Sequence, residues 1–250
     1  MEKTSVYIIS ILISLFSTPA KAQDQPSDSV EIPLKLKVGI DVAGPVIYFT
    51  NKNILSIEGY FSADLNEKMA LYFNTGYSDY KYSQFNYDYF SKGFFVKAGI
   101  DFNLQKPEVS LGKYWAGIGL HYGLSSFISE TPFLKYENYW GTTSSYIPRE
   151  THWAHYIEAS PGFRAGIFKN FSIGWSVSLR KMLYSGTGKD LKPIYIPGYG
   201  TAAKSFSVGI SYYLMWNIPY KKIKVAIKVD EPEEPEEPVN NETGASVSGN

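Results

Sequence analysis

Near its end the chain reads Phe206-Ser207-Val208-Gly209-Ile210-Ser211-Tyr212-Tyr213-Leu214-Met215-Trp216. Large apolar side chains occupy every second position, and most of the positions between them are small or polar. This alternation of period two is typical of a β-strand whose two faces meet different environments. The stretch is also about as long as a tilted strand that crosses a bilayer. We therefore predict a transmembrane strand here and an all-β fold.

Four residues of this strand also form a sequence signal. They are a polar residue, a glycine, an aromatic residue and a final apolar residue: Ser207, Gly209, Tyr212 and Leu214. Their order is similar to the terminal-strand signal that is read by the insertion machinery for outer-membrane barrels. The signal predicts that machinery as a partner.

Seven earlier stretches alternate in the same way, and no helical period is found between them. These stretches are 34–42, 55–65, 69–78, 93–104, 114–124, 153–167 and 171–180. The connections are short or moderate at 66–68, 105–113 and 168–170, and long at 43–54, 79–92, 125–152 and 185–204. Short turns at one end and long loops at the other are typical of outer-membrane barrels. The sequence predicts an eight-stranded antiparallel up-and-down transmembrane β-barrel with short periplasmic turns, long extracellular loops and periplasmic termini.

The two faces of these strands differ in composition. One face is large and apolar on all eight strands, and the other is rich in glycine and serine. Small residues suit the crowded lumen of an eight-stranded barrel, and a large apolar face suits lipid. The alternative is a secreted lipocalin-like carrier with the apolar face turned inward.

The predicted lumen face also carries charges of both signs. The charge network is predicted to contain Lys37, Asp41, Glu58, Lys97, Asp101, Glu158, Arg164 and Arg180, and Lys35 and Asp64 lie on the same face. Buried charges persist when they are paired and hydrogen-bonded, so a balanced set predicts a closed, charge-paired lumen. A narrow pore or a proton path is the alternative.

The ends of the chain differ from the barrel in composition. Residues 1–22 predict a signal peptide, because Lys3 precedes an apolar run and Ala20-Lys21-Ala22 offers a cleavage site. Residues 23–33 are expected to form a flexible periplasmic lead-in and residues 34–218 the barrel. Residues 219–250 are expected to form a disordered periplasmic tail, first basic and then acidic and rich in Pro and Glu, which could contact a periplasmic partner.

The chain resembles an uncharacterised family of outer-membrane β-barrel proteins from Gram-negative, Bacteroidetes-type bacteria. The resemblance covers about residues 34–228. It rests on strings such as Leu55-Ser56-Ile57-Glu58-Gly59-Tyr60-Phe61, Gly188-Lys189-Asp190-Leu191-Lys192-Pro193 and Trp216-Asn217-Ile218-Pro219-Tyr220. It implies a fold and an outer-membrane location. No activity comes with this family, so it implies no functional residues.

Aromatic residues gather in two of the predicted outer loops. The candidates for recognition are Tyr82, Tyr87, Tyr89, Tyr139, Trp140 and Tyr146. Exposed aromatic rings stack on sugars or bind protein partners, so an extracellular glycan or protein is the expected partner. We also expect contact with outer-membrane lipid and lipopolysaccharide, a monomeric state, and no nucleic-acid partner, since 24 basic residues balance 24 acidic ones.

Little in the sequence points to catalysis. A lipid A or phospholipid acyl hydrolase or transferase would need a histidine beside a serine, and His121 with Ser125 and Ser126 is the nearest approach to this. His152 and His155 alone make a poor metal site, and the chain has no cysteine. We therefore expect no enzyme activity, no cofactor, no metal and no catalytic residue.

Overall fold

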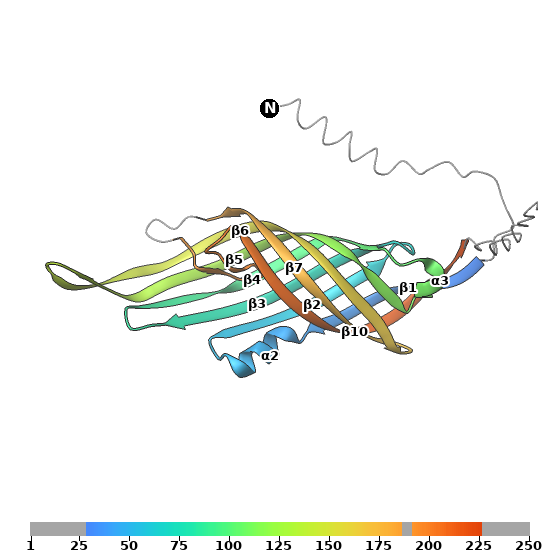
Figure 1. Cartoon of the computed structure of the whole chain (residues 1–250), viewed down its shortest axis with the longest axis horizontal. Coiled ribbons are helices and arrows are strands. Elements are labelled where there is room, and N and C mark those ends of the chain that lie inside the picture. The colour runs from blue at the N-terminus through green and yellow to red at the C-terminus, as the bar shows by residue number, and fades with distance from the viewer. Residues whose placement is uncertain (1–28, 187–191, 227–250) are drawn as a thin grey trace, which may run out of the picture. The chain divides into compact units, whose positions relative to one another are not determined.

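The computed structural model describes residues 29–186 and 192–226 (Figure 1). Its long strands are β1 Ser29–Asp41, β2 Ile54–Asp64, β3 Met69–Ser83, β4 Tyr87–Asn103, β5 Tyr114–Asn138, β6 Gly141–Phe168, β7 Phe171–Ser185 and β10 Phe206–Ala226. They form one closed barrel in the order β1-β10-β7-β6-β5-β4-β3-β2. The predicted eight-stranded antiparallel up-and-down barrel is confirmed.

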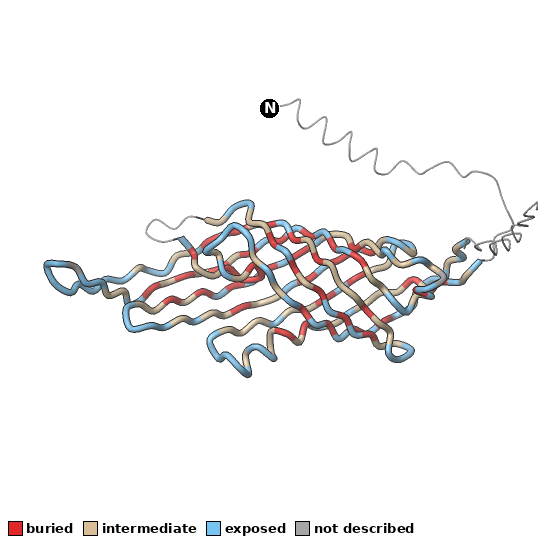
Figure 2. Tube along the Cα trace, in the orientation of Figure 1, coloured by how far each residue is buried: buried red, intermediate tan, exposed pale blue. Residues whose placement is uncertain are grey.

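The large apolar side chains lie on the outside of this barrel. In β4 the residues from Ser91 to Ala98 alternate strictly between buried and exposed, and Figure 2 shows the same alternation on neighbouring strands. Each strand exposes a large apolar residue to the outside: Ile40, Phe61, Phe73, Val96, Leu120, Ile157, Leu179 and Ile210. The buried face carries charged residues, serines and tyrosines. This is the reverse of a lipocalin-like carrier, whose cavity is apolar.

One end of the barrel, which we call the short-turn end, holds tight connections. Asn66 shapes the β2–β3 turn, because its side-chain oxygen accepts hydrogen bonds from the backbone of Lys68 and Met69. Residues 169–170 join β6 to β7, and the helix α3 Pro107–Ser110 lies between β4 and β5. The sequence predicted no helix in this connection, since four residues are too few to show a helical period.

The opposite end, which we call the hairpin end, differs from the expected long loops. The expectation of loops over 79–92 and 125–152 is wrong, since β3 and β4 continue to a turn at 84–86 and β5 and β6 to a turn at 139–140. Pairing runs as far as Asn138 with Gly141. Near this tip both faces of β6 are exposed, so the alternation that marks a strand is lost.

The connection between β1 and β2 contains a second helix, α2 Ala43–Thr50, that the sequence analysis also missed. Figure 1 shows it outside the ring of strands, beyond the end of β1. Its residues Ala-Gly-Pro-Val-Ile-Tyr-Phe-Thr are apolar on every side, so no amphipathic pattern marks it. It is the longest described helix, and no helix in the described part of the chain is long and apolar enough to cross a membrane.

The barrel also extends beyond its predicted bounds of 34–218. β1 already begins at Ser29, within the expected lead-in, and β10 continues to Ala226, within the expected tail. An exposed ion pair between Glu31 and Lys222, at 3.7 Å, joins the two extensions. The predicted signal peptide at 1–22, the first part of the lead-in and the acidic tail from residue 227 lie outside the described residues.

Candidate functional site: the charged lumen and its plug

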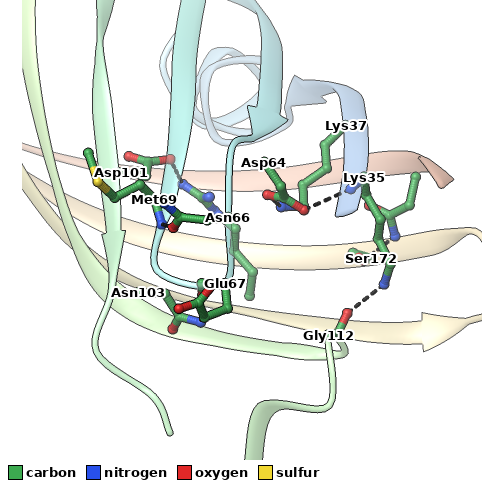
Figure 3. A network of polar contacts seen from close by, with 12 residues as sticks. Lys35, Lys37, Asp64, Asn66, Glu67, Met69, Asp101, Asn103, Gly112 and Ser172 are labelled. Carbon is green, nitrogen blue, oxygen red and sulfur yellow. Dashed lines mark hydrogen bonds and ion pairs between the residues drawn. The ribbon is translucent and has the colours of Figure 1, made fainter. Parts of the chain in front are cut away.

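The lumen at the short-turn end holds the first group of charges (Figure 3). The Lys37 amine forms an ion pair with the Asp64 carboxylate, whose second oxygen accepts a hydrogen bond from the Lys35 backbone at 3.0 Å. The Lys35 amine donates to the carbonyl of Gly112 at 2.5 Å. These contacts tie β1 to β2 and to the connection before β5, so they close the mouth of the barrel with polar groups.

His121 lies between two carboxylates in the middle of the lumen. Its Nε2 atom is 3.0 Å from Oδ1 of Asp101, and its Nδ1 atom is 3.1 Å from Oε1 of Glu158. The ring also stacks on Tyr72, with 3.7 Å between ring centroids. β4, β5 and β6 supply Asp101, His121 and Glu158, and the register of these strands sets Gly99 opposite His121 and His121 opposite Glu158.

Three cations complete this central network. Arg164 donates to Asp101 at 2.6 Å, and Arg180 donates to Glu158 at 2.7 Å. The amine of Lys97 is 3.3 Å from Glu158 and 3.5 Å from Glu58. Three carboxylates therefore face three cations around a histidine. The side chains of Glu158 and Lys97 are each 1 % exposed, so these charges depend on one another rather than on water.

Glycines make room for this network on the neighbouring strands. A side chain at Gly209 would lie 2.8 Å from the Arg180 guanidinium, and one at Gly119 would meet Asp101 and His121. The guanidinium of Arg164 lies over the ring of Trp115, 4.0 Å from the ring centre, and the two residues are opposite each other on β6 and β5. The many glycines of the lumen face thus have a packing role.

Asp41 is an exception among the eight residues predicted for the charge network. Its carboxylate accepts hydrogen bonds from the backbone amides of Ala43 at 2.8 Å and Tyr212 at 2.9 Å. No described ion pair includes it. The prediction that Asp41 belongs to the network is corrected: it caps the end of β1 at the junction with β10, because β1 stops there.

A folded loop plugs the lumen at the hairpin end. The short strands β8 Tyr195–Ile196 and β9 Gly200–Thr201 pair across a turn at Pro197 and Gly198. Gly198 has φ +73°, and the amide of Tyr199 donates to the carbonyl of Ile196 at 3.1 Å, as in a type II turn. Ile196 and Tyr199 are fully buried against Phe127, Ala154 and Tyr156. We call residues 194–201 the plug.

The plug is joined to the central network and to the barrel wall. Arg180, which binds Glu158, also donates to the Tyr199 carbonyl at 3.1 Å, and Ser207 donates to the same carbonyl at 2.8 Å. The Tyr195 hydroxyl is 3.0 Å from the Ser78 hydroxyl, and burial raises the pKa of the Tyr195 phenol, so this group stays protonated. Sequence reasoning treated 185–204 as an outer loop. The pair Pro197-Gly198 between two apolar residues is a sequence signal for this turn. No local pattern indicates that the loop folds into the lumen.

The residues predicted for recognition at the outer loops divide into three groups. Tyr139 and Trp140 form the tip of the β5–β6 hairpin and are 93 % and 89 % exposed, and Tyr146 is exposed on β6 nearby. Tyr82 and Tyr87 pack together on the β3–β4 hairpin, with 5.3 Å between their rings. Tyr89 is buried, and its hydroxyl accepts a hydrogen bond from the Ile194 amide at 3.0 Å. The expectation for Tyr89 is therefore corrected, because it holds the plug.

The predicted insertion signal lies along the strand β10. Tyr212 and Leu214 point outward and are exposed, whereas Ser207 and Gly209 face the lumen and contact the plug and Arg180. Two of the four residues thus also have a structural role. Reading of the signal by an insertion machinery stays a prediction.

The geometry does not assemble a hydrolase centre around His121. Both of its ring nitrogens face carboxylates, so neither is directed at Ser125 or Ser126. His155 instead contacts the Tyr122 hydroxyl at 2.8 Å on the outer face. Within the described ranges, no group of three or more His, Asp or Glu residues is arranged to hold a metal ion.

Comparison with known proteins identifies the family. Residues 4–223 match a family model described as Domain of unknown function (DUF6048). The chain belongs to this family. The DUF6048 description states no activity, and no curated protein matches the chain.

Solved structures similar to this DUF6048 chain include three bacterial proteins. Ail, the attachment invasion locus protein of Yersinia pestis, is 10% identical with a TM-score of 0.35, covering 76% of this chain and 97% of that chain. Acinetobacter baumannii CarO is 11% identical with a TM-score of 0.38, covering 76% and 98%. The N-terminal β-barrel domain of Pseudomonas aeruginosa OprF is 9% identical with a TM-score of 0.32, covering 75% and 99%. Identities this low carry no statement about function.

Proposed function

We propose that the protein is an outer-membrane β-barrel, closed to solutes, that presents the β5–β6 hairpin outside the cell for contact with a surface partner. The short-turn end and both termini then lie in the periplasm, and phospholipid and lipopolysaccharide surround the barrel. The observation that carries the proposal is the exposed apolar belt on all eight strands around a charged interior. Exposure of such a large apolar surface to water is strongly unfavourable, whereas contact between this surface and lipid is favourable.

The height of the belt supports this location. On β10 the exposed apolar positions run from Phe206 to Tyr220, but both faces of the strand are exposed from Ile218 to Lys222, so we take the belt as Phe206 to Trp216. Ten steps along a strand span about 33 Å, which at a tilt of about 40° is about 25 Å, the usual height of the apolar band of such barrels. The belt carries Trp216 and Tyr114 toward the short-turn end, and Trp153 and Tyr184 toward the hairpin end. Aromatic rings at both edges suit the two membrane interfaces.

The contacts within the lumen favour a closed barrel over a pore. The mouth at the short-turn end is bridged by Lys37 with Asp64, the middle by the pairs around His121, and the hairpin end by the plug. An ion would have to separate buried pairs to pass.

The tip of the β5–β6 hairpin supports the proposed contact. Tyr139 and Trp140 pack edge to face, at 5.2 Å between ring centroids, and are almost fully exposed. Their position beyond the belt places them away from the proposed membrane. We propose an extracellular glycan as the partner, since two crossed aromatic faces suit stacking on sugar rings.

The location is tested by gel mobility of the folded protein in the outer-membrane fraction. We expect the unheated protein to run faster than the boiled protein, because a closed barrel resists detergent, and we expect no ion conductance in planar bilayers. A protein found in the soluble periplasm without a mobility shift would contradict the proposed location, and stepwise conductance would contradict the closed lumen.

A pair of variants serves as the control for the face assignment. Ile210→Arg, near the middle of the belt, is expected to lower the free energy of unfolding in vesicles by about 2–4 kcal/mol, and Phe206→Arg, at its edge, by about 0–1 kcal/mol. Equal effects at both positions would argue against a membrane around β10.

The proposed contact is tested with the full-length barrel in detergent on an array of immobilised glycans. We expect Tyr139→Ser with Trp140→Ser to lower binding at least about tenfold, because stacking on each ring contributes about 1 kcal/mol. Phe85→Ser is the matched control, since Phe85 is 84 % exposed at the neighbouring β3–β4 turn. Absence of glycan binding, or equal losses in both variants, would overturn the proposal of a glycan.

A further inference from the structure

The place where β1 ends is unusual for a barrel wall. β1 pairs with β2 only through Leu36–Asp41, and the last described contact of this segment with β10 is from the Val42 amide to the Tyr212 carbonyl. Toward the hairpin end, the two neighbouring strands extend further than β1, because β10 begins at Phe206 and β2 begins at Ile54. Because the belt on β10 is centred near Ser211, β1 stops close to the middle of the belt. The outer half of this strand position is replaced by α2.

The composition of α2 suits the interior of a membrane. Ala43 is buried against the barrel, whereas Val46, Ile47 and Phe49 are 58 %, 45 % and 76 % exposed. A helix that is apolar on its exposed side as well as on its packed side requires an apolar environment. Eight helical residues rise about 12 Å, close to the half-thickness of about 15 Å of a hydrocarbon core. The polar turn at 51–53 therefore reaches toward the headgroups.

A groove lies between α2 and the outside of the barrel. It has a volume of about 710 Å³, with Val46 and Ile47 on the helix side. Its floor is formed by β6, β7 and β10, where the cross-strand row Phe163, Trp175 and Tyr212 adjoins the small residue Ala165. A shallow depression of about 650 Å³ lies elsewhere on the wall around Ala98, but only strands line it.

A positive charge stands at the end of α2. The amine of Lys52 lies 4.5 Å from the ring centre of Tyr48 and 5.1 Å from that of Phe49. No described ion pair includes Lys52. Two aromatic rings below the amine place it where a membrane meets water. A cation at that depth attracts an anionic headgroup.

We infer that α2 and the outer wall hold one anionic phospholipid of the surrounding leaflet, with an acyl chain in the groove and the headgroup phosphate near Lys52. This inference rests on the proposed membrane location. Lipid tails are as apolar as the groove, so apolarity alone gives no preference for the site. The preference comes from the two walls, which give one chain more van der Waals contacts than an open strand surface does, and from the charge.

The test is native mass spectrometry of the full-length barrel, released from detergent micelles that contain either phosphatidylglycerol or phosphatidylcholine. We expect the wild-type barrel to retain one phosphatidylglycerol. Ala165→Trp, which fills the floor of the groove, is expected to lower the retained fraction at least tenfold. Ala98→Trp, an outward alanine in the open depression, is the matched control and is expected to retain lipid as the wild type does. Lys52→Gln is expected to lower retention of phosphatidylglycerol about fivefold and to leave phosphatidylcholine unchanged.

The outcomes separate this inference from the proposed location. Each variant is first checked for the heat-dependent mobility shift, so that only folded barrels are compared. Three results with folded barrels would overturn the inference while the membrane location stands. The wild-type barrel would retain no lipid, or Ala165→Trp and Ala98→Trp would lose lipid equally. The third result is a dimer whose two copies meet at the α2 groove. A soluble protein without the mobility shift would overturn both.

Discussion

Replacing Glu158 by glutamine is expected to lower the free energy of unfolding by about 3–5 kcal/mol. The Glu158 carboxylate contacts Lys97, Arg180 and His121 at 3.3 Å, 2.7 Å and 3.1 Å. Its removal leaves two buried cations without their shared partner. Desolvation of an unpaired charge costs more than the pair contributes when it is intact, so the loss exceeds that of an ordinary hydrogen bond. The measurement is urea unfolding of the barrel in lipid vesicles, followed by gel mobility.

Glu150→Gln is the matched control on the same strand. Its side chain is 26 % exposed and lies 3.9 Å from His152, so we expect a loss below about 1 kcal/mol. Adding Arg180→Met to Glu158→Gln removes the cation whose described ion pair is with Glu158, and it should recover part of the stability. If the losses of Arg180→Met and Glu158→Gln simply add in the double variant, or if Glu158→Gln costs no more than Glu150→Gln, the charges in the lumen do not act as a network.

Replacing Gly198 by valine is expected to release the plug while the barrel stays folded. Gly198 has φ +73°, and a side chain there would press on the Phe95 ring and the Tyr156 hydroxyl. Backbone strain alone costs about 1–3 kcal/mol for a β-branched residue, which raises the population of the open plug about 5–150-fold. Tyr195 and Tyr199, which are packed inside the mouth, then become accessible.

The measurement is the rate of cleavage by chymotrypsin after Tyr195 and Tyr199, read from the released peptides so that cuts at the exposed hairpin tip are counted separately. Thr201→Val is the control, because Thr201 is exposed in the same small hairpin and its replacement changes little volume. Cleavage at the plug that is equal in wild type and Gly198→Val would contradict the expected release of the plug.

The amino-acid sequence by itself determined the strands of the belt and the two faces of the barrel. A strand whose two faces meet different environments alternates in sequence, and from Phe206 to Trp216 every second residue is large and apolar. The same alternation placed Lys97, Asp101, Glu158, Arg164 and Arg180 on the lumen face. Local pattern was sufficient here because each residue responds to the environment on its own side of the strand.

Only the tertiary structure decided which of these charges meet. His121 joins Asp101 to Glu158 because the register sets Gly99, His121 and Glu158 side by side on three strands, and a shift of one residue would turn them to the other face. Asp41 is not part of the network, because β1 ends at this residue and its carboxylate accepts hydrogen bonds from backbone amides instead. Register depends on all the pairings around the ring at once, and no single strand contains that information.

The tertiary structure also decided the features outside the belt. Near the tip of the β5–β6 hairpin both faces are exposed, so the strand there carries no alternation to read. The plug is held by Arg180, Ser207 and Tyr89, which lie far from it in sequence or on other strands. α2 is apolar on every side, so no amphipathic pattern marks it. The hairpin tip therefore depends on the pairing of β5 with β6, and the plug depends on contacts with other strands, rather than on a local pattern.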